Sequence, residues 1–310
     1  MIAVVGSINT DLVVEVPRMP RPGETLQGQR ASFYPGGKGA NQAVAAARLG
    51  AGVAFFGKLG EDTFGEQLLR GLTENGVDVS AIGLEENVSS GLANIWVTDD
   101  GENAIALTPG ANAQVDRSYV DRNFKSIAQS EVLLLQLEIP LKTIEYLLRS
   151  LSSSKPTVIL DPAPAQDLSC LPLERIDILT PNQLELASIT GSEDIEEGLR
   201  QLLARGVKHI LCTLGNKGAY WASQQRAVHV PAYKVEPIDT TAAGDAFNGA
   251  LAWALLTTPI DEAVRWANAA GALATTRKGA QPSLPTLDEL KQFLDTMSST
   301  DSRGRSGHQP

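Results

Sequence analysis

Short apolar β-rich runs alternate repeatedly with segments of helical periodicity along this chain. The alternation begins with IAVVGSI at residues 2–8, KGANQAVAAARLG at 38–50, VAFFGKL at 53–59 and TFGEQLLRGLTENG at 63–76. The later apolar runs EVLLLQL, PTVILDP, IDILTPN and VKHILCTLG are unbroken, as in strands that are covered on both faces. Strands that alternate with helices predict βαβ units and a mostly parallel sheet.

Two stretches interrupt this alternation. Residues 11–35 contain the extended pieces DLVVEV and LQGQRASFY, and residues 91–109 alternate apolar and polar side chains about a strong hairpin-turn signal, Asp100-Gly101. Strands without crossover helices predict a small antiparallel β lid, which can close a site or pair with a copy of itself. We therefore expect residues 1–297 to form one domain with these lid strands inserted. The polar, Gly- and Ser-rich residues 298–310 are expected to be a disordered tail.

The charge of the chain limits its partners. Its 310 residues carry a formal net charge of −10 without a run of lysine or arginine, which argues against nucleic acid and against an anionic membrane. An anionic ligand must then be held by a local device such as a helix N-terminus or a bound cation. The N-terminus has no basic leader, and no stretch reaches the ~20 apolar residues of a membrane span. We therefore expect a cytoplasmic protein.

A glycine-rich segment, YPGGKGANQ at residues 34–42, precedes the first helix pattern. Glycines at this point would let a ligand approach the backbone at a helix N-terminus. The segment does not match the dinucleotide-binding pattern GxGxxG, because Gln42 stands at the third glycine position counted from Gly37. By itself it fits both a ligand site and an ordinary tight turn.

A second segment, DTTAAGDAF at residues 239–247, precedes the apolar helix pattern NGALAWALL. Small residues at a helix start leave backbone N–H groups bare, which suits the charge that develops on a transferred phosphoryl group. Asp245 follows these residues and could accept the proton of an attacking hydroxyl. A carboxylate in the first helical turn is also a common cap. Its combination with Gly244 and the small residues favours the catalytic interpretation.

Two strand ends carry candidate nucleotide contacts. Asn182 and Glu185 are three residues apart, so they share a helix face and could hold hydrated magnesium and phosphate. The same pair fits an ordinary capping box, which the pattern alone favours. The segment TLGNKG at residues 213–218 closes an apolar strand with glycines. A nucleotide could lie along its backbone, or the segment could be only a turn.

Together these motifs resemble the ribokinase/PfkB family of carbohydrate kinases, over residues 1 to about 295. GGKGANQA at 36–43 and DTTAAGDAFNGA at 239–250 match the two signature regions of the family. TRKGAQPSLP at 276–285 is similar to a run in the members that phosphorylate ribose. The resemblance implies a three-layer α/β/α core with a mostly parallel sheet, and a β lid through which two subunits form a homodimer.

The resemblance also implies roles for single residues. Asp245 matches the general base, and the backbone of Ala243 and Gly244 matches the anion hole, with Ala242 where many members carry glycine. The implied sugar-binding residues are Asn9, Asp11, Gly37, Lys38, Asn41, Glu138 and Asp245. The implied nucleotide-binding residues are Asn182, Glu185, Thr213, Gly215, Asn216, Gly218, Gly244 and Asn268. Without the resemblance, Asp11 and Glu138 look like solvated or capping acids.

The resemblance further implies a potassium site. Its ligands would be Asp239, Ser283 and the carbonyl groups of Thr241, Ala274, Arg277 and Gly279. A bound potassium ion would fix the geometry of the anion hole and add positive charge near the phosphates. Without the resemblance, these segments fit a turn followed by a proline-containing loop.

The implied reaction is the transfer of the γ-phosphoryl group of ATP to O5 of D-ribose, with Mg²⁺ on the nucleotide and K⁺ as activator. Closure of the lid would exclude water and suppress ATP hydrolysis. One alternative is a kinase of the same family that acts on deoxyribose, fructose or a nucleoside such as adenosine. Another is a catalytically silent sugar-binding regulator on the same fold. The missing GxGxxG pattern disfavours a dinucleotide-dependent oxidoreductase.

Overall fold

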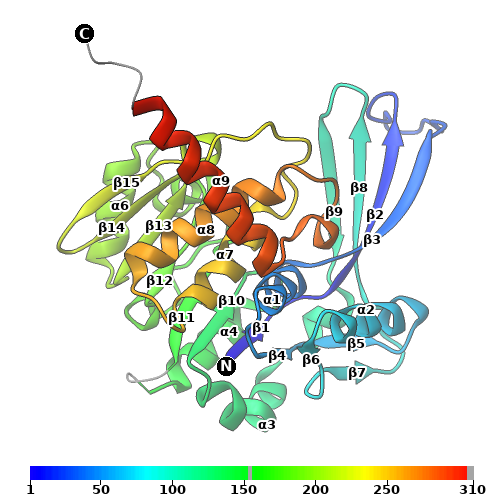
Figure 1. Ribbon diagram of the computed structural model, residues 1–310. Helices are drawn as coiled ribbons and strands as arrows, with labels where there is room; N and C mark the ends of the chain where they lie inside the picture. The colour runs from blue at the N-terminus through cyan, green and yellow to red at the C-terminus, as the bar shows by residue number, and fades with distance from the viewer. Residues whose placement is uncertain (153–155, 306–310) are drawn as a thin grey trace.

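The computed structural model describes the backbone of residues 1–152 and 156–305, and side chains as far as residue 297. Its centre is a nine-stranded sheet (Figure 1). The pairs from β13 to β6 are parallel, and β14 and β15 extend one edge antiparallel, which confirms the expected mostly parallel sheet. The spatial order is β15 (Ala227–Val230), β14 (Ala219–Ser223), β13 (His209–Thr213), β12 (Ile178–Leu179), β11 (Thr157–Leu160), β10 (Val132–Leu135), β1 (Ile2–Val5), β4 (Val53–Phe56) and β6 (Val77–Asp78).

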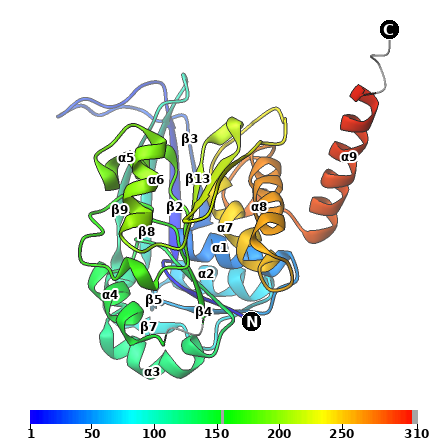
Figure 2. The same ribbon diagram turned by 90° about the vertical axis from the view of Figure 1, so that its left-hand side faces the viewer.

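Helices cover both faces of this sheet, which gives the three layers visible in Figure 2. In β1, Ile2 and Val4 pack into one core cluster while Ala3 and Val5 pack into the other, which explains why the strand sequences are apolar throughout. The first layer contains α1 (Lys38–Arg48), α2 (Thr63–Glu74), α7 (Ala243–Ala254) and α8 (Ile260–Ala274), with α9 (Leu287–Arg305) outside it. The second contains α3 (Arg117–Ala128), α4 (Leu141–Ser150), α5 (Gln183–Thr190) and α6 (Ile195–Ala204).

A four-stranded sheet projects from the edge of this core, at the upper right of Figure 1. Its strands, in spatial order, are β3 (Arg30–Gly36), β2 (Asn9–Val16), β8 (Gly91–Thr98) and β9 (Asn103–Thr108). The predicted turn at Asp100-Gly101 is confirmed, with Gly101 at φ 85° and its N–H donating to the Thr98 carbonyl at 2.9 Å. The sheet differs from the expectation in one respect, because its central pair, β2 and β8, is parallel. Both strands leave the core in the same direction.

Short elements complete the structure. They are β5 (Lys58–Gly60) and β7 (Gly83–Glu85), which form a two-stranded parallel sheet, and the 3₁₀ turns η1 (Gly110–Gln114), η2 (Leu173–Arg175), η3 (Gly215–Lys217) and η4 (Gln281–Ser283). Among the described helices, none has the length and apolar character to cross a membrane.

Helix α9 continues to Arg305, whereas the sequence predicts a disordered tail from residue 298. The prediction for residues 306–310 lies outside the described residues.

Candidate active site

The glycine-rich segment lies where β3 ends and α1 begins, pressed against the chain that joins β1 to β2. Gly37 is the N-cap of α1 at φ 88°, and a Cβ atom there would lie 2.7 Å from the Asn9 backbone nitrogen. A Cβ atom at Gly39 would lie 2.7 Å from the backbone nitrogen of Ser7. These glycines therefore allow the start of α1 to touch residues 7–9, which brings two of the predicted sugar-binding segments together.

Glu138 collects the polar groups of this junction. Its Oε2 atom accepts hydrogen bonds from the Ser7 hydroxyl at 2.6 Å, the Lys38 backbone N–H at 3.1 Å and the Asn9 side-chain amide at 3.4 Å. Three predicted sugar-binding residues, Asn9, Lys38 and Glu138, thus meet although they lie far apart in the sequence. Glu138 is not a solvated acid.

Asn112 in η1 holds Asn9 in place and was not predicted from the sequence. Its side chain exchanges two hydrogen bonds with the backbone of Ile8, at 2.9 and 3.1 Å, as a neighbouring strand would. It also donates to Asn9 Oδ1 at 2.7 Å. This contact directs the Asn9 amide nitrogen toward Glu138. Asn112 is a buried polar residue in a short 3₁₀ turn. It belongs to none of the sequence motifs, so no sequence pattern pointed to it.

Asp11 follows Asn9 on the same face of β2 and lies close to the other acids. Burial raises the pKa of its carboxyl group to about 7, with the nearby charges of Glu138 and Asp245 contributing. Burial lowers the pKa of the Lys38 ammonium group. The negative charges of four carboxylates outweigh this effect, so the pKa of Lys38 is raised. Those carboxylates belong to Asp161, Asp245, Glu138 and Glu185. The predicted sugar-binding residues Asp11, Glu138 and Asp245 therefore form an acidic cluster, with the Lys38 ammonium group as its cation.

Asp245 lies in the first turn of α7 and is nearly buried, with 5% of its surface exposed. Its Oδ2 atom accepts a hydrogen bond from the Asn41 side chain at 2.9 Å, and its Oδ1 atom accepts one from Gln42 at 3.1 Å. These donors reach it because α1 and α7 pack closely at Gly249, where a Cβ atom would lie 2.4 Å from that of Ala45. Gln42 belongs to a motif that we singled out, but its contact with Asp245 was not predicted.

The start of α7 also presents free backbone donors. Ala242 has the left-handed conformation (φ 59°), and the turn brings the Ala243 N–H within 3.3 Å of the Thr240 carbonyl. The next two N–H groups, of Gly244 and Asp245, have no hydrogen-bond partner within the described part of the chain. The predicted anion hole used Ala243 and Gly244. The local turn occupies the first of these donors and leaves Gly244 and Asp245 available.

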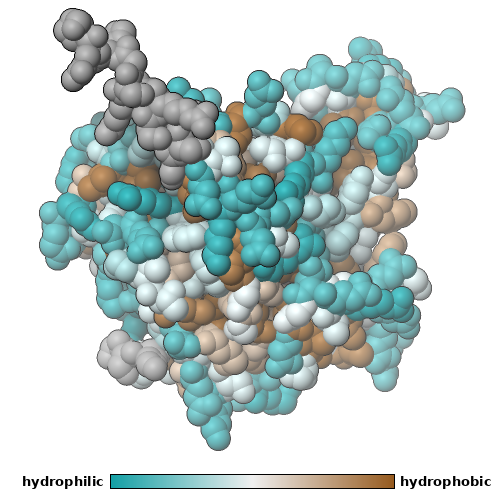
Figure 3. Space-filling view, viewed as in Figure 1, coloured by the Kyte–Doolittle hydropathy of each residue, from teal (hydrophilic) through white to brown (hydrophobic). Residues whose placement is uncertain are grey.

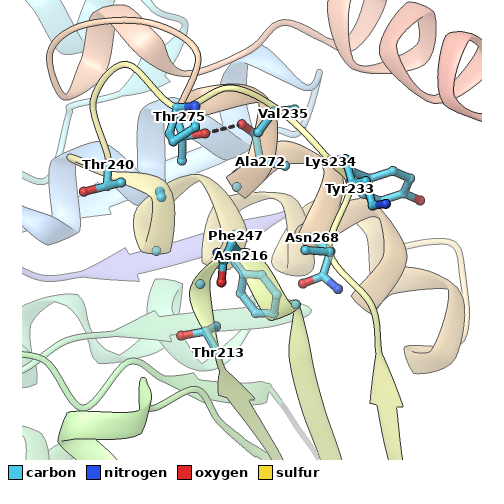
Figure 4. Close-up of a pocket in the computed structure, with 17 residues that line it drawn as sticks. Thr213, Asn216, Tyr233, Lys234, Val235, Thr240, Phe247, Asn268, Ala272 and Thr275 are labelled. Atoms are coloured by element: carbon cyan, nitrogen blue, oxygen red, sulfur yellow. Dashed lines mark hydrogen bonds between the residues drawn. The ribbon is translucent and has the colours of Figure 1, made fainter.

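A cavity of about 560 Å³ opens beside this turn and is shown in Figure 4. Of the predicted nucleotide-binding residues, it is lined by Thr213, Gly215, Asn216, Gly218, Gly244 and Asn268. The sequence analysis gave no role to the apolar wall of the cavity, which includes Phe247 and Ala272, or to the segment after β15 that edges it, with Tyr233, Lys234 and Val235. The hydroxyl of Thr275 donates to the Ala272 carbonyl at 2.7 Å in this wall (Figure 4). The size suits a small ligand with an apolar ring.

Asn182 and Glu185 do not line this cavity, but Asn182 forms a parallel bridge with Thr213, which does. The two residues form the reciprocal capping box of α5. Asn182 Oδ1 accepts from the Glu185 N–H, and Glu185 Oε2 accepts from the Asn182 N–H, both at 2.8 Å. The capping interpretation is therefore confirmed, and the magnesium role stays a prediction.

The two predicted potassium-binding loops are joined by Asp239. Its carboxylate accepts the Thr241 N–H at 2.9 Å and the Gly279 N–H at 2.8 Å. Burial would raise the pKa of Asp239, but these hydrogen bonds outweigh it and keep that pKa below its usual value. The Ala274 carbonyl already accepts the Arg277 N–H at 3.3 Å, and the Ser283 hydroxyl donates to Ala280 at 2.8 Å. In the described residues, no group of three or more His, Cys, Asp or Glu side chains could hold a metal ion.

Comparison with known proteins identifies the family. The model of the pfkB family carbohydrate kinases matches residues 1–287. The chain belongs to this family. A pfkB kinase needs a sugar site and a nucleotide site that meet at the transferred phosphoryl group, and here the acidic cluster and the cavity adjoin at the first turn of α7.

Three relatives show which members of the family this chain is similar to. Ribokinase of Haemophilus influenzae is 42% identical over 95% of this chain and 98% of its own length. Deoxyribokinase of Salmonella typhi is 34% identical over 94% and 98% of the two chains. The structure of Arabidopsis thaliana ribokinase complexed with ribose and ATP is 33% identical, with a TM-score of 0.88 over 94% of this chain and 98% of that chain. The expected α/β core and β lid are therefore those of the ribokinase fold.

Proposed function

We propose that this protein transfers the γ-phosphoryl group of ATP to O5 of D-ribose, with Asp245 as the general base. One observation carries the proposal. The Asp245 carboxylate and the free N–H groups of Gly244 and Asp245 belong to the same helical turn, with the acidic cluster on one side and the cavity on the other. A proton acceptor and a phosphate-binding group are thus adjacent at the boundary between two ligand sites. The similarity to proteins named ribokinase supports ribose as the substrate.

In this proposal the acidic cluster binds the sugar. The side-chain oxygen Asn41 Oδ1 is buried without a hydrogen-bond partner in the described structure, next to the amide nitrogen that contacts Asp245. A sugar hydroxyl would satisfy it, since a buried unpaired acceptor is costly. Asn9, Asp11 and Glu138 can accept or donate several further hydrogen bonds, which favours a ligand with many hydroxyl groups.

Asp245 then takes the proton of the attacking hydroxyl as its oxygen bonds to the γ-phosphorus and the bond to the β-phosphate oxygen breaks. The N–H groups of Gly244 and Asp245 stabilise the charge on the transferred group. Asn216, Asn268 and Phe247, which line the cavity, would hold the nucleoside part of ATP. Lys38, the one cation of the acidic cluster, would offset phosphate charge.

Two cations fit the donor groups of the chain. Glu185 uses only its Oε2 atom in the capping box, so its other oxygen could hold a water of hydrated Mg²⁺ near the nucleotide phosphates. The loops joined by Asp239 offer carbonyl and hydroxyl oxygens, which suit a hard cation such as K⁺. When bound, these ions would neutralise phosphate charge and fix the turn that carries Gly244.

We also propose that the lid pairs two copies of the chain as a homodimer. Ile105 and Leu107 in β9 are 61% and 38% exposed. They are two residues apart, so both lie on the same face of the lid, which is the face that carries Asp11. Brown apolar groups lie among the teal ones at the upper right of Figure 3, where Figure 1 places the lid. A second lid would cover such groups. The use of ATP supports a cytoplasmic location.

The same site would also suit 2-deoxyribose, since a relative named deoxyribokinase is 34% identical. The deciding experiment measures ADP formation from MgATP with ribose, deoxyribose, fructose or adenosine, each in potassium and in sodium. We expect ribose to give the highest kcat/KM and potassium to increase it. Higher kcat/KM with deoxyribose would keep the mechanism and change the substrate. No turnover with any acceptor would contradict the kinase proposal.

A further inference from the structure

A network of buried amide and carboxyl groups continues from Asp245 into the core. The Gln42 Nε2 atom donates to Asp245 Oδ1 at 3.1 Å and also to Asp161 Oδ2 at 2.8 Å. On its other side, Gln42 Oε1 accepts a hydrogen bond from Gln136 Nε2 at 2.7 Å. Both glutamines are fully buried, and Asp161 is 5% exposed. Nothing in the proposed reaction uses Gln42, Gln136 or Asp161.

The geometry fixes the orientation of the Gln42 amide. Its nitrogen carries two hydrogens and faces two carboxyl groups, so each hydrogen has one acceptor. If the amide were flipped, its oxygen would face both carboxyl groups and the hydrogen bond to Asp245 would be lost. Asp161 therefore supplies the second acceptor that holds the amide in the orientation that Asp245 needs.

Asn41 completes the arrangement from the neighbouring position of α1. Its amide holds Asp245 Oδ2 while Gln42 holds Asp245 Oδ1. Two consecutive residues thus fix both oxygens of the carboxylate. A carboxylate has about four lone-pair directions, so two hydrogen bonds leave room for the substrate proton while they prevent the group from rotating.

Asp161 is a costly residue for this part of the core. Burial raises the pKa of its carboxyl group to about 8, partly opposed by the charge of Lys38. A buried acid without an ion pair disfavours folding relative to an apolar residue of similar size. A role in orienting Gln42 would explain why an acid occupies this buried position.

We propose that Gln42 and Asp161 are positioning residues for the general base: Asp161 orients the Gln42 amide, which holds the Asp245 carboxylate toward the sugar hydroxyl. The proposal rests on the proposed function of Asp245. Neither residue touches the substrate in this scheme. Their loss should therefore act on the chemical step and not on binding.

The test compares Gln42→Met and Asp161→Leu, which remove the contact, with Asp161→Asn, which keeps an acceptor for Gln42. We expect the first two to lower kcat by about 10- to 100-fold, with KM for ribose and ATP within about twofold of wild type. Asp161→Asn should recover most of the lost kcat. A purely structural role would change the melting temperature without this selective loss of kcat. Unchanged kcat in Gln42→Met, or equal losses in the two Asp161 variants, would overturn the proposal.

A crystal structure of Gln42→Met gives a readout that does not depend on the substrate. We expect the Asp245 carboxylate to rotate or to occupy two orientations, whereas a single wild-type orientation would contradict the inference. If the wild-type enzyme failed to phosphorylate ribose, the proposed function would fail, and this structure would still decide the positioning role. If Asp161→Leu did not fold, Gln42→Met alone would decide it.

Discussion

Gly249 of α7 lies against Ala45 of α1 so closely that a Cβ atom on the glycine would stand 2.4 Å from the alanine Cβ and 2.8 Å from the Gln42 carbonyl oxygen. This contact lies one helical turn after Asp245. It sets the separation of the two helices, and so it determines whether Asn41 and Gln42 reach the Asp245 carboxylate.

Replacing Gly249 with alanine should therefore destabilise the protein by about 1–3 kcal/mol through overpacking. Urea denaturation would measure the change in the free energy of unfolding. Gly71→Ala in α2 is the matched control, because nothing lies within 4 Å of its added Cβ atom. That control should gain up to about 1 kcal/mol from helix propensity. Equal effects of the two substitutions would contradict the packing argument.

Asp245→Asn should retain ribose binding and lose turnover by roughly 10³-fold, because the amide cannot accept the hydroxyl proton. Steady-state kinetics measures kcat, and calorimetry measures ribose affinity. Asp295→Asn, exposed on α9, is the control and should behave as wild type. Turnover within about tenfold of wild type in Asp245→Asn would remove Asp245 as the base.

The raised pKa of Asp11 gives a stability prediction with a definite sign. Its folded-state pKa of about 7 lies above the usual 3.8, so its contribution to stability is complete below pH 3.8 and is lost as the pH rises through 7. The free energy of unfolding of the wild-type protein should fall when the pH is raised from 5 to 8. In Asp11→Asn, which cannot ionise at this position, the fall should be smaller by on the order of 1–2 kcal/mol. Urea titrations at both pH values test this. Parallel losses in variant and wild type would refute it, and Asp295→Asn should follow wild type.

Asp239→Ala should abolish activation by potassium, because it removes a candidate ligand and the hydrogen bonds that join the two loops. The ratio of the rates in potassium and in sodium should fall toward one, and KM for ATP should rise. Asp288→Ala, exposed on α9, should preserve the wild-type ratio. A full potassium effect in Asp239→Ala would place the cation elsewhere.

Ala242→Gly should stabilise the protein by up to about 1 kcal/mol, because alanine in the left-handed conformation is strained while glycine adopts it freely. Thermal denaturation measures the change. Asn87→Gly is the matched control, since Asn87 also has a positive φ of 60° but asparagine tolerates it better. A gain at Asn87 as large as that at Ala242 would contradict this account.

The core strands and α1 could be predicted from the sequence because burial on both faces leaves a direct record in apolar runs. The parallel pairing of β2 with β8 could not, since it depends on the direction in which two distant strands leave the core. Motifs likewise singled out Asp245, Asn41 and Gly244 as candidates, and the side chains of the first two are hydrogen-bonded in the structure. Asn112 and Asp161 were missed because each acts by touching a residue that is remote in the sequence, and neither belongs to a recognisable local pattern.

The position of Asp245 directly after Gly244 has a consequence for how this enzyme could be altered. The proposed proton acceptor and the proposed phosphate-binding N–H groups are separated by a single peptide unit, so a few backbone torsions set the positions of both. A tilt of α7 would move the two together, and no adjustment of the helix could tune one step of the transfer while leaving the other as it is. New acceptor specificity would therefore come more readily from sugar-side residues outside that turn, such as Asn9 and Asp11 on β2, than from α7 itself.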